Sequence, residues 1–330
     1  MSLGAGAGVV RRRLSAPVMT MSRSQRLRMT GAAFAIATTP LSAAPPQAQF
    51  TTHSEIVVLH VRVTDRGGSY ASGLTADAFR ILEEGRPQEV RFFESEDAPI
   101  TVGLIIDSSG SMRNARDRII AASAEFVQSS NPDDEVFALV FNDFVRPVLT
   151  ESTPFTGDAG TLRNALSDVF EPSGRTALYD AVAEGLAYGA HGVRDRRALV
   201  VLSDGGDNAS KTRFADVMTQ VESSNAVIYT VALADPLDTD SDPRRLARIA
   251  ETSGGKAFEP KDVAGVHQAF QQIVRDIRHS YTIGYEPMRA DRRTGFRRIR
   301  VEAHAPDGRR LATRTRTGYL AQTDTAKRSE

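Results

Sequence analysis

The sequence predicts an α/β protein: a doubly wound, mostly parallel sheet with one antiparallel edge strand, inserted between two β-rich flanks. Three observations predict this class. Between residues 99 and 278, short apolar runs alternate with longer helical patterns, which is typical of a sheet covered by helices on both faces. One apolar run follows another after a gap too short for a crossover helix. On both sides of this region, β-type alternation replaces the helical patterns.

The alternating region has strand and helix signals in regular succession. The strand patterns are Thr101–Ile106, Val136–Phe141, Ala198–Leu202 and Val227–Ala232. The helical patterns are Ala115–Ser129, Ala159–Phe170, Ala177–Tyr188, Phe214–Ser223, Pro243–Thr252 and Val263–Ile277. The run Phe144–Leu149 begins almost directly after Phe141, so we expect it to pair antiparallel at the sheet edge, where Pro147 is tolerated.

The two flanks carry strand patterns without helices. The patterns are Glu55–Asp65, Arg80–Leu82 and Val90–Phe93 before the α/β region, and Tyr281–Tyr285, Phe296–Ala303 and Leu311–Thr315 after it. Neither flank alone is large enough to bury a core, so we expect them to pair into one small β-sandwich. The expected domains are residues 49–97 and 279–322 for its two halves, 98–278 for the α/β domain, and 323–330 for a tail.

The first 48 residues follow the pattern of an export signal. Met21–Arg28 is basic, Gly31–Ala37 is a short apolar segment, and small and proline residues continue to Ala48. We therefore expect residues 1–48 to be an export signal or a disordered leader, and the protein to be extracytoplasmic, either periplasmic or secreted. No later segment reaches the length of a membrane span, so none is expected in the mature chain.

Composition excludes several classes of site. The chain has no cysteine, which excludes disulfides, thiolate metal sites and a cysteine nucleophile. Its histidines are scattered without the spacing of a zinc site. The 41 basic and 41 acidic residues balance, so no general attraction to nucleic acid is expected. The basic run Arg292–Arg298 lacks a regular pattern of interleaved aromatic residues and is expected to be a solvated hairpin.

Polar residues with oxygen side chains stand where the predicted strands end. Asp107 comes directly after the run Thr101–Ile106, and hydroxyl residues and a second aspartate follow at similar positions. The candidate site residues are Asp107, Ser109, Ser111, Thr176 and Asp204. Because open α/β sheets place ligands at the carboxyl ends of their strands, we expect these side chains to meet. An all-oxygen cluster of this kind suits Mg²⁺, with Mn²⁺ or Ca²⁺ also possible. We expect Asp207 and Asn208 to shape the loop.

These segments resemble the metal-ion-dependent adhesion site of the von Willebrand factor type A domain. That motif is Asp-x-Ser-x-Ser, a distant Thr and a distant Asp, and all five positions match here. The flanks resemble a bacterial group related to these domains, in the segments Gly73–Phe79, Glu84–Gln88 and Gly318–Tyr319. The resemblance implies that the hydroxyls bind the metal directly and that the aspartates bind it directly or through water.

The resemblance implies a non-enzymatic, Mg²⁺-dependent binding module outside the cytoplasm. Its partner would be a protein that presents an Asp or Glu side chain, because hydroxyls and two carboxylates leave the metal short of charge and ligands. Two alternatives stay open. One is a cytoplasmic assembly subunit that works beside an ATPase. The other is a metal-dependent phosphatase or hydrolase with Asp107 as nucleophile, although no histidine is near the motif.

Overall fold

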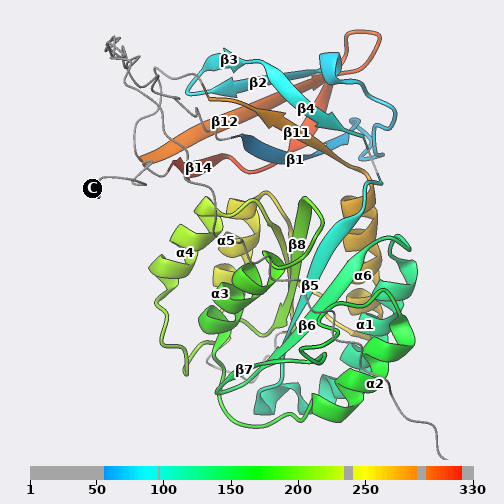
Figure 1. The fold of residues 1–330 in the computed structure, drawn as a ribbon, viewed down its shortest axis with the longest axis vertical. Coiled ribbons are helices and arrows are strands. Elements are labelled where there is room, and N and C mark those ends of the chain that lie inside the picture. The colour runs from blue at the N-terminus through cyan, green and yellow to red at the C-terminus, as the bar shows by residue number, and fades with distance from the viewer. Residues whose placement is uncertain (1–55, 96, 234–240, 288–294, 322–330) are drawn as a thin grey trace, which may run out of the picture. The chain divides into compact units, whose positions relative to one another are not determined.

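The structure, a computed structural model, describes residues 56–95, 97–233, 241–287 and 295–321 (Figure 1). The predicted leader, residues 1–48, and the tail, residues 323–330, lie outside these ranges. The described residues form two sheets, one from the central α/β region and one from the flanks. No helix among them is long and apolar enough to cross a membrane.

The central sheet has the strand order β10-β9-β8-β5-β6-β7. Its strands are β5 (Ile100–Asp107), β6 (Glu135–Phe141), β7 (Val145–Pro147), β8 (Arg196–Ser203), β9 (Val227–Ala232) and β10 (Ala257–Phe258). All neighbours are parallel except β6 and β7, so the antiparallel edge strand is confirmed. Strand β10 was not predicted, because a run of two residues carries no periodic signal.

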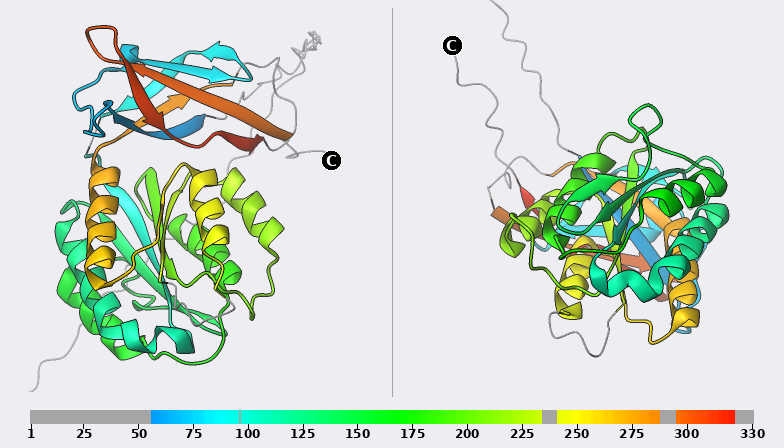
Figure 2. Two further views of the ribbon diagram at one scale, coloured as in Figure 1. Left: turned by 180° about the vertical axis from the view of Figure 1, so that it is seen from behind. Right: turned by 90° about the horizontal axis from the view of Figure 1, so that it is seen from below.

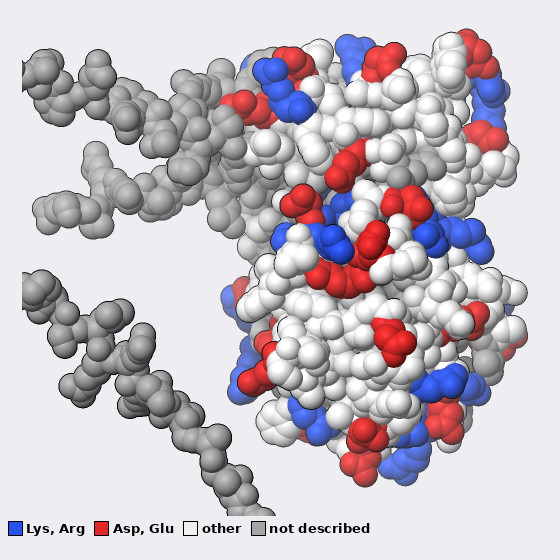
Figure 3. Space-filling model, turned by 45° about the vertical axis from the view of Figure 1, so that its right-hand side comes forward, with Lys and Arg blue, Asp and Glu red and all other residues white. Residues whose placement is uncertain are grey.

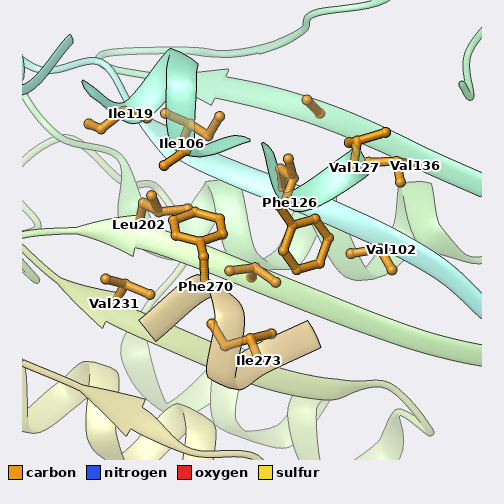
Figure 4. Packing of buried hydrophobic residues seen from close by; sticks show 14 of the residues in the cluster. Val102, Ile106, Ile119, Phe126, Val127, Val136, Leu202, Val231, Phe270 and Ile273 are labelled. Carbon is orange, nitrogen blue, oxygen red and sulfur yellow. The ribbon is translucent and has the colours of Figure 1, made fainter. Parts of the chain in front are cut away.

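Helices cover both faces of this sheet (Figures 1 and 2). One face packs against α1 (Arg116–Ser129), α2 (Ala159–Val169) and α6 (Val263–Arg278), and the other against α3 (Leu178–Gly189), α4 (Phe214–Ser223) and α5 (Pro243–Ser253). In the first core, the rings of Phe126 and Phe270 meet edge to face at 5.7 Å, beside Ile106 and Leu202 (Figure 4). The short 3-10 helix η2 (Gly110–Ala115) precedes α1 and starts at the candidate site.

The flanks interleave in one antiparallel sheet. The first flank supplies β1 (Val57–Thr64), the 3-10 helix η1 (Ala76–Ala78), β2 (Phe79–Glu83), β3 (Arg86–Gln88) and β4 (Val90–Glu94). The second supplies β11 (Ser280–Tyr285), β12 (Gly295–His304), β13 (Arg310–Arg314) and β14 (Gly318–Ala321). The order is β3-β2-β12-β13-β1-β11-β4, and β14 also pairs with β12. Strands β1, β2 and β4 each pair with a strand of the other flank.

Pairing of the flanks is confirmed, but the predicted β-sandwich is corrected. The strands form a continuous hydrogen-bonded path instead of two separate sheets, because β1 pairs on one side with β11 and on the other with β13. The alternating sequence pattern is the same in both arrangements and does not distinguish them. The path encloses a core that includes Leu59, Ile81 and Tyr281.

A buried ion pair joins the flanks inside this core. Arg297 Nη1 donates to Glu83 Oε1 at 2.6 Å, and the Tyr285 hydroxyl donates to Glu83 Oε2 at 2.5 Å. The Arg297 side chain is only 7% exposed, so its prediction as part of a solvated hairpin was wrong. The basic composition of the run does not indicate that one of its side chains points into the core. On β12, buried and exposed residues alternate, and Arg297 is one of the buried ones.

Arg196 holds both points where the chain passes between the flanks and the α/β region. Its Nη1 donates to the Ala98 carbonyl at 2.8 Å, just before β5. Its Nη2 donates to the carbonyls of Ile277 at 2.8 Å and Ser280 at 3.4 Å, at the end of α6 and the start of β11. The side chain is buried, so these carbonyls are satisfied without water.

We predict that Arg196→Met lowers the free energy of unfolding by roughly 2–4 kcal/mol, because it leaves buried carbonyls without donors. Chemical denaturation monitored by circular dichroism measures the loss. Arg146→Met, an exposed arginine on β7, is the control and should change stability by less than about 0.5 kcal/mol. Equal effects of the two variants would contradict the role of Arg196.

His60 on β1 lies near two buried arginines. Burial is the main cause that lowers the pKa of His60 from 6.5 to about 3, and the positive charges of Arg196 and Arg316 add to it. The residue keeps some exposed surface, but its ring Nε2 is buried. Arg316, after β13, donates to the carbonyls of Glu222 at 2.8 Å and Ser224 at 2.6 Å.

We predict that His60 makes the fold sensitive to acid. The unfolded chain takes up a proton on His60 below pH 6.5, but the folded protein does not until about pH 3, so lowering the pH favours unfolding. Relative to His60→Asn, the wild type should lose up to about 3 kcal/mol between pH 7 and pH 4. Urea titrations at several pH values measure this difference. His191→Asn, at an exposed position, should keep the wild-type slope.

Candidate metal site

Four of the five predicted site residues, all but Thr176, meet at the carboxyl ends of β5 and β8. Asp107 is the last residue of β5, and Asp204 directly follows β8, its neighbour in the sheet. Ser109 and Ser111 lie at the start of η2, with their hydroxyl oxygens 3.0 Å apart. The Ser111 hydroxyl donates to Asp204 Oδ2 at 2.8 Å, so two of the three sequence segments are in direct contact.

The third segment, which carries Thr176, is bonded to the first through the backbone. The amide of Gly110 donates to the Gly174 carbonyl at 3.3 Å, and the amide of Ser173 to the Ser108 carbonyl at 2.9 Å. The amide of Thr176 donates to Asn208 Oδ1 at 2.9 Å. Among the described residues, the Thr176 hydroxyl has no hydrogen-bond partner, so its oxygen is available as a ligand.

Asp107 is held rigidly by its neighbours. Its Oδ1 accepts a hydrogen bond from the Ser109 amide at 2.8 Å, and its Oδ2 accepts one from the Ser203 hydroxyl at 2.6 Å. Sequence analysis missed Ser203, although its position directly before Asp204 at the end of a strand was a usable signal. Asp204 Oδ1 in turn accepts from the Gly206 amide at 2.9 Å.

The charge of the site is unbalanced. The residues Asp107 and Asp204 are 0% and 2% exposed, and within the described ranges neither forms an ion pair with Lys, Arg or His. Burial raises the pKa of Asp107 to about 7, and the negative charge of Asp204 contributes to the rise. Two buried carboxylates without a cation cost stability. Together with three hydroxyls, they fit a hard divalent cation such as Mg²⁺.

The side chains of the five candidate residues offer only hydroxyl and carboxylate oxygens as metal ligands. No group of three or more His, Cys, Asp or Glu that could hold a metal occurs in the part of the chain that the structure describes. Asp207 and Asn208 bond to the loop, as expected: Asp207 Oδ1 accepts from the Tyr179 amide at 3.2 Å, and Asn208 holds Thr176. The five predicted residues stay the candidates for holding a cation.

The family model of the von Willebrand factor type A domain matches residues 102–272, which is more than half of the chain. The chain belongs to this family. The match runs from within β5 to within α6 and includes the five candidate site residues. No curated protein matches the sequence.

Solved structures of type A domains and pilus proteins are similar to this chain. The PilB minor pilin from Streptococcus sanguinis is 11% identical, with a TM-score of 0.46 over 59% of this chain and 64% of the pilin. A von Willebrand factor type A protein from Catenulispora acidiphila is 14% identical, with a TM-score of 0.45 over 84% of this chain and 76% of that protein.

The vWF domain of the type V pili tip protein Mfa5 from Porphyromonas gingivalis is 13% identical, with a TM-score of 0.43 over 55% of this chain and 95% of that domain. The matches span only 62% and 64% of two structures of the PilB pilin. All these scores are low, so membership rests on the family model.

The turn before Thr176 depends on Gly174. This residue has a φ of +75°, and a Cβ there would lie 2.0 Å from Asp143 Oδ2. We predict that Gly174→Ala costs about 1–2 kcal/mol from the left-handed backbone and roughly 1–3 kcal/mol more from the clash. Gly308→Ala is the control, because Gly308 has a φ of +81° with nothing within 4 Å. Thermal denaturation of both variants separates the two costs, and equal losses would contradict the packing of Asp143 against this turn.

Proposed function

We propose that this chain is an extracytoplasmic, non-enzymatic module that binds a protein partner through a Mg²⁺ ion and a partner carboxylate. One observation carries the proposal: two buried carboxylates, with no basic partner among the described residues, stand with the hydroxyls of Ser109 and Ser111 at the carboxyl ends of β5 and β8. Mn²⁺ or Ca²⁺ are possible in place of Mg²⁺. Membership of the type A domain family supports an interaction module of this kind.

The residues of the chain favour reversible capture of an acidic side chain. Asp107 is fixed by Ser109 and Ser203 and would contribute charge without moving. Asp204 is bonded through the Ser111 hydroxyl, so the two carboxylates need not both contact the ion. A bound divalent cation would supply positive charge for a partner's Asp or Glu, since the hydroxyl ligands are neutral.

Surface charge does not favour nucleic acid as the partner. The formal net charge is zero, and on the face drawn in Figure 3 basic and acidic side chains are interspersed. A binding stripe for nucleic acid would need basic side chains clustered on one surface. Export of the protein depends on the leader at residues 1–48 and remains a prediction.

We predict opposite effects of Asp107→Asn with and without metal. In EDTA at pH 8 the variant should be at least as stable as the wild type, because it removes one of two buried negative charges. With millimolar Mg²⁺ or Mn²⁺ the wild type should gain stability by linkage, whereas the variant should not. Thermal melts of both proteins under both conditions measure this crossover.

Asp216→Asn is a matched control, because Asp216 is an exposed carboxylate paired with Arg213 on α4. It should keep the full metal response. Thr176→Val removes only the free hydroxyl and should weaken the metal response without abolishing it. A wild-type protein whose melting temperature is the same in EDTA and in saturating Mg²⁺ and Mn²⁺ would contradict the metal site.

A further inference from the structure

We infer that the partner segment carries a second carboxylate and a neighbouring apolar side chain, which bind Arg175 and Phe144 on the rim of the metal site. This inference rests on the proposed function and specifies the partner that it needs. Arg175 directly precedes Thr176, and Phe144 lies in the turn between β6 and β7. Neither residue belongs to the five that would hold the cation.

The turn that carries Phe144 is bonded to the loop of the site. The Ala177 amide donates to the Asn142 carbonyl at 2.8 Å, and the Asn142 amide donates to the Phe144 carbonyl at 3.1 Å. Thr176 and Ala177 are consecutive, so the turn and the site loop form one hydrogen-bonded rim. The rim therefore has a fixed backbone beside the predicted metal ligand Thr176.

The Arg175 guanidinium is hydrogen-bonded within the protein through Nε, which leaves Nη1 and Nη2 for a partner. Its Nε donates to Asp143 Oδ1 at 2.8 Å, and its backbone amide donates to Asp143 Oδ2 at 3.1 Å. These two bonds to Asp143 orient the guanidinium. Among the described residues, Nη1 and Nη2 have no hydrogen-bond partner. The side chain is 65% exposed. Two free, parallel N–H groups on an oriented arginine match a carboxylate in bidentate geometry.

The orientation of Arg175 is built into the loop. Hydrogen bonds from Arg175 lower the pKa of Asp143, which keeps this carboxylate charged. Gly174 lets Asp143 approach the turn, since a Cβ at Gly174 would lie 2.0 Å from Asp143 Oδ2. Holding Nε in place removes part of the entropy that a free arginine loses on binding. The oriented Arg175 is thus a better partner for a carboxylate than a flexible surface lysine would be.

Phe144 supplies the apolar part of the rim. Its side chain is 72% exposed, which is uncommon for phenylalanine and leaves most of its apolar surface in water. Aromatic and arginine side chains together are the residue types that dominate the binding energy of protein interfaces. A partner segment with one acid at the metal, a second acid at Arg175 and an apolar residue against Phe144 would use all three features.

The test is selection of a displayed random peptide library on the wild-type protein in Mg²⁺ and in EDTA. We expect Mg²⁺-dependent peptides with two acidic residues and one aromatic or aliphatic residue. Peptides selected on Arg175→Gln should lose only the preference for the second acid. Peptides selected on Phe144→Ser should lose only the preference for the apolar residue. Arg163→Gln and Val193→Ser, at exposed positions on α2 and before β8, should leave both preferences unchanged.

Affinity measurements on one selected synthetic peptide show whether Arg175 contacts the second acid of the peptide directly or affects binding in another way. Arg175→Gln should weaken binding about ten- to a hundredfold, as expected for a charge-assisted hydrogen bond. Replacing the second acid of the peptide by its amide should cost a similar factor. The two changes together should cost little more than either alone, because both remove the same contact.

The outcomes distinguish this inference from the proposed function. Mg²⁺-dependent peptides with a single acid, or an unchanged second acid on Arg175→Gln, would overturn the inference and leave the metal-dependent site standing. Fully additive losses in the double-mutant cycle would do the same. A wild-type protein that selects no Mg²⁺-dependent peptide would overturn the proposed function, and this inference with it.

Discussion

The structure depends on the burial of β5 at the centre of the parallel sheet. Every residue of Ile100–Asp107 is buried, and the strand is hydrogen-bonded to β6 on one side and β8 on the other. Ile106 faces the core with α1 and α6, and Ile105 the core with α3 and α5. A strand enclosed in this way has no freedom to shift its register. Its final residue, Asp107, is therefore placed where no solvent stabilises its charge.

The cost of this placement points to function. A protein selected for stability alone would pair a buried carboxylate with a cation or replace it. Here Asp107 and Asp204 stand together, and the chain surrounds them with hydroxyls instead of a lysine or arginine. Arginines elsewhere in the molecule do pair with buried acids, as Arg297 does with Glu83 and Arg62 with Asp276. Within the described ranges, the lack of a basic partner for Asp107 and Asp204 is thus a local property of the site.

The flanks and the α/β region are joined by contacts that no short segment could make alone. Arg196 binds carbonyls at both crossings of the chain. Asp276 on α6 accepts hydrogen bonds from Arg62 at 2.6 Å and from the Tyr70 hydroxyl, both from the first flank. The last helix of the type A domain is therefore fixed to the flank strand β1 by a buried charge. The flank sheet therefore combines strands from both sides of the inserted domain.

The sequence by itself determined the helices of the α/β region and all its strands except β10, because hydrophobic periodicity is a local signal that a run of two residues does not carry. It also determined the five candidate site residues, since parallel strands must end at a common edge. The tertiary structure alone decided the single path of the flank strands, the inward side chain of Arg297, the hydrogen bond from Ser203 to Asp107 and the pair of Asp143 with Arg175. Each of these joins residues that are distant in the chain. Their proximity follows from packing, which no local pattern encodes.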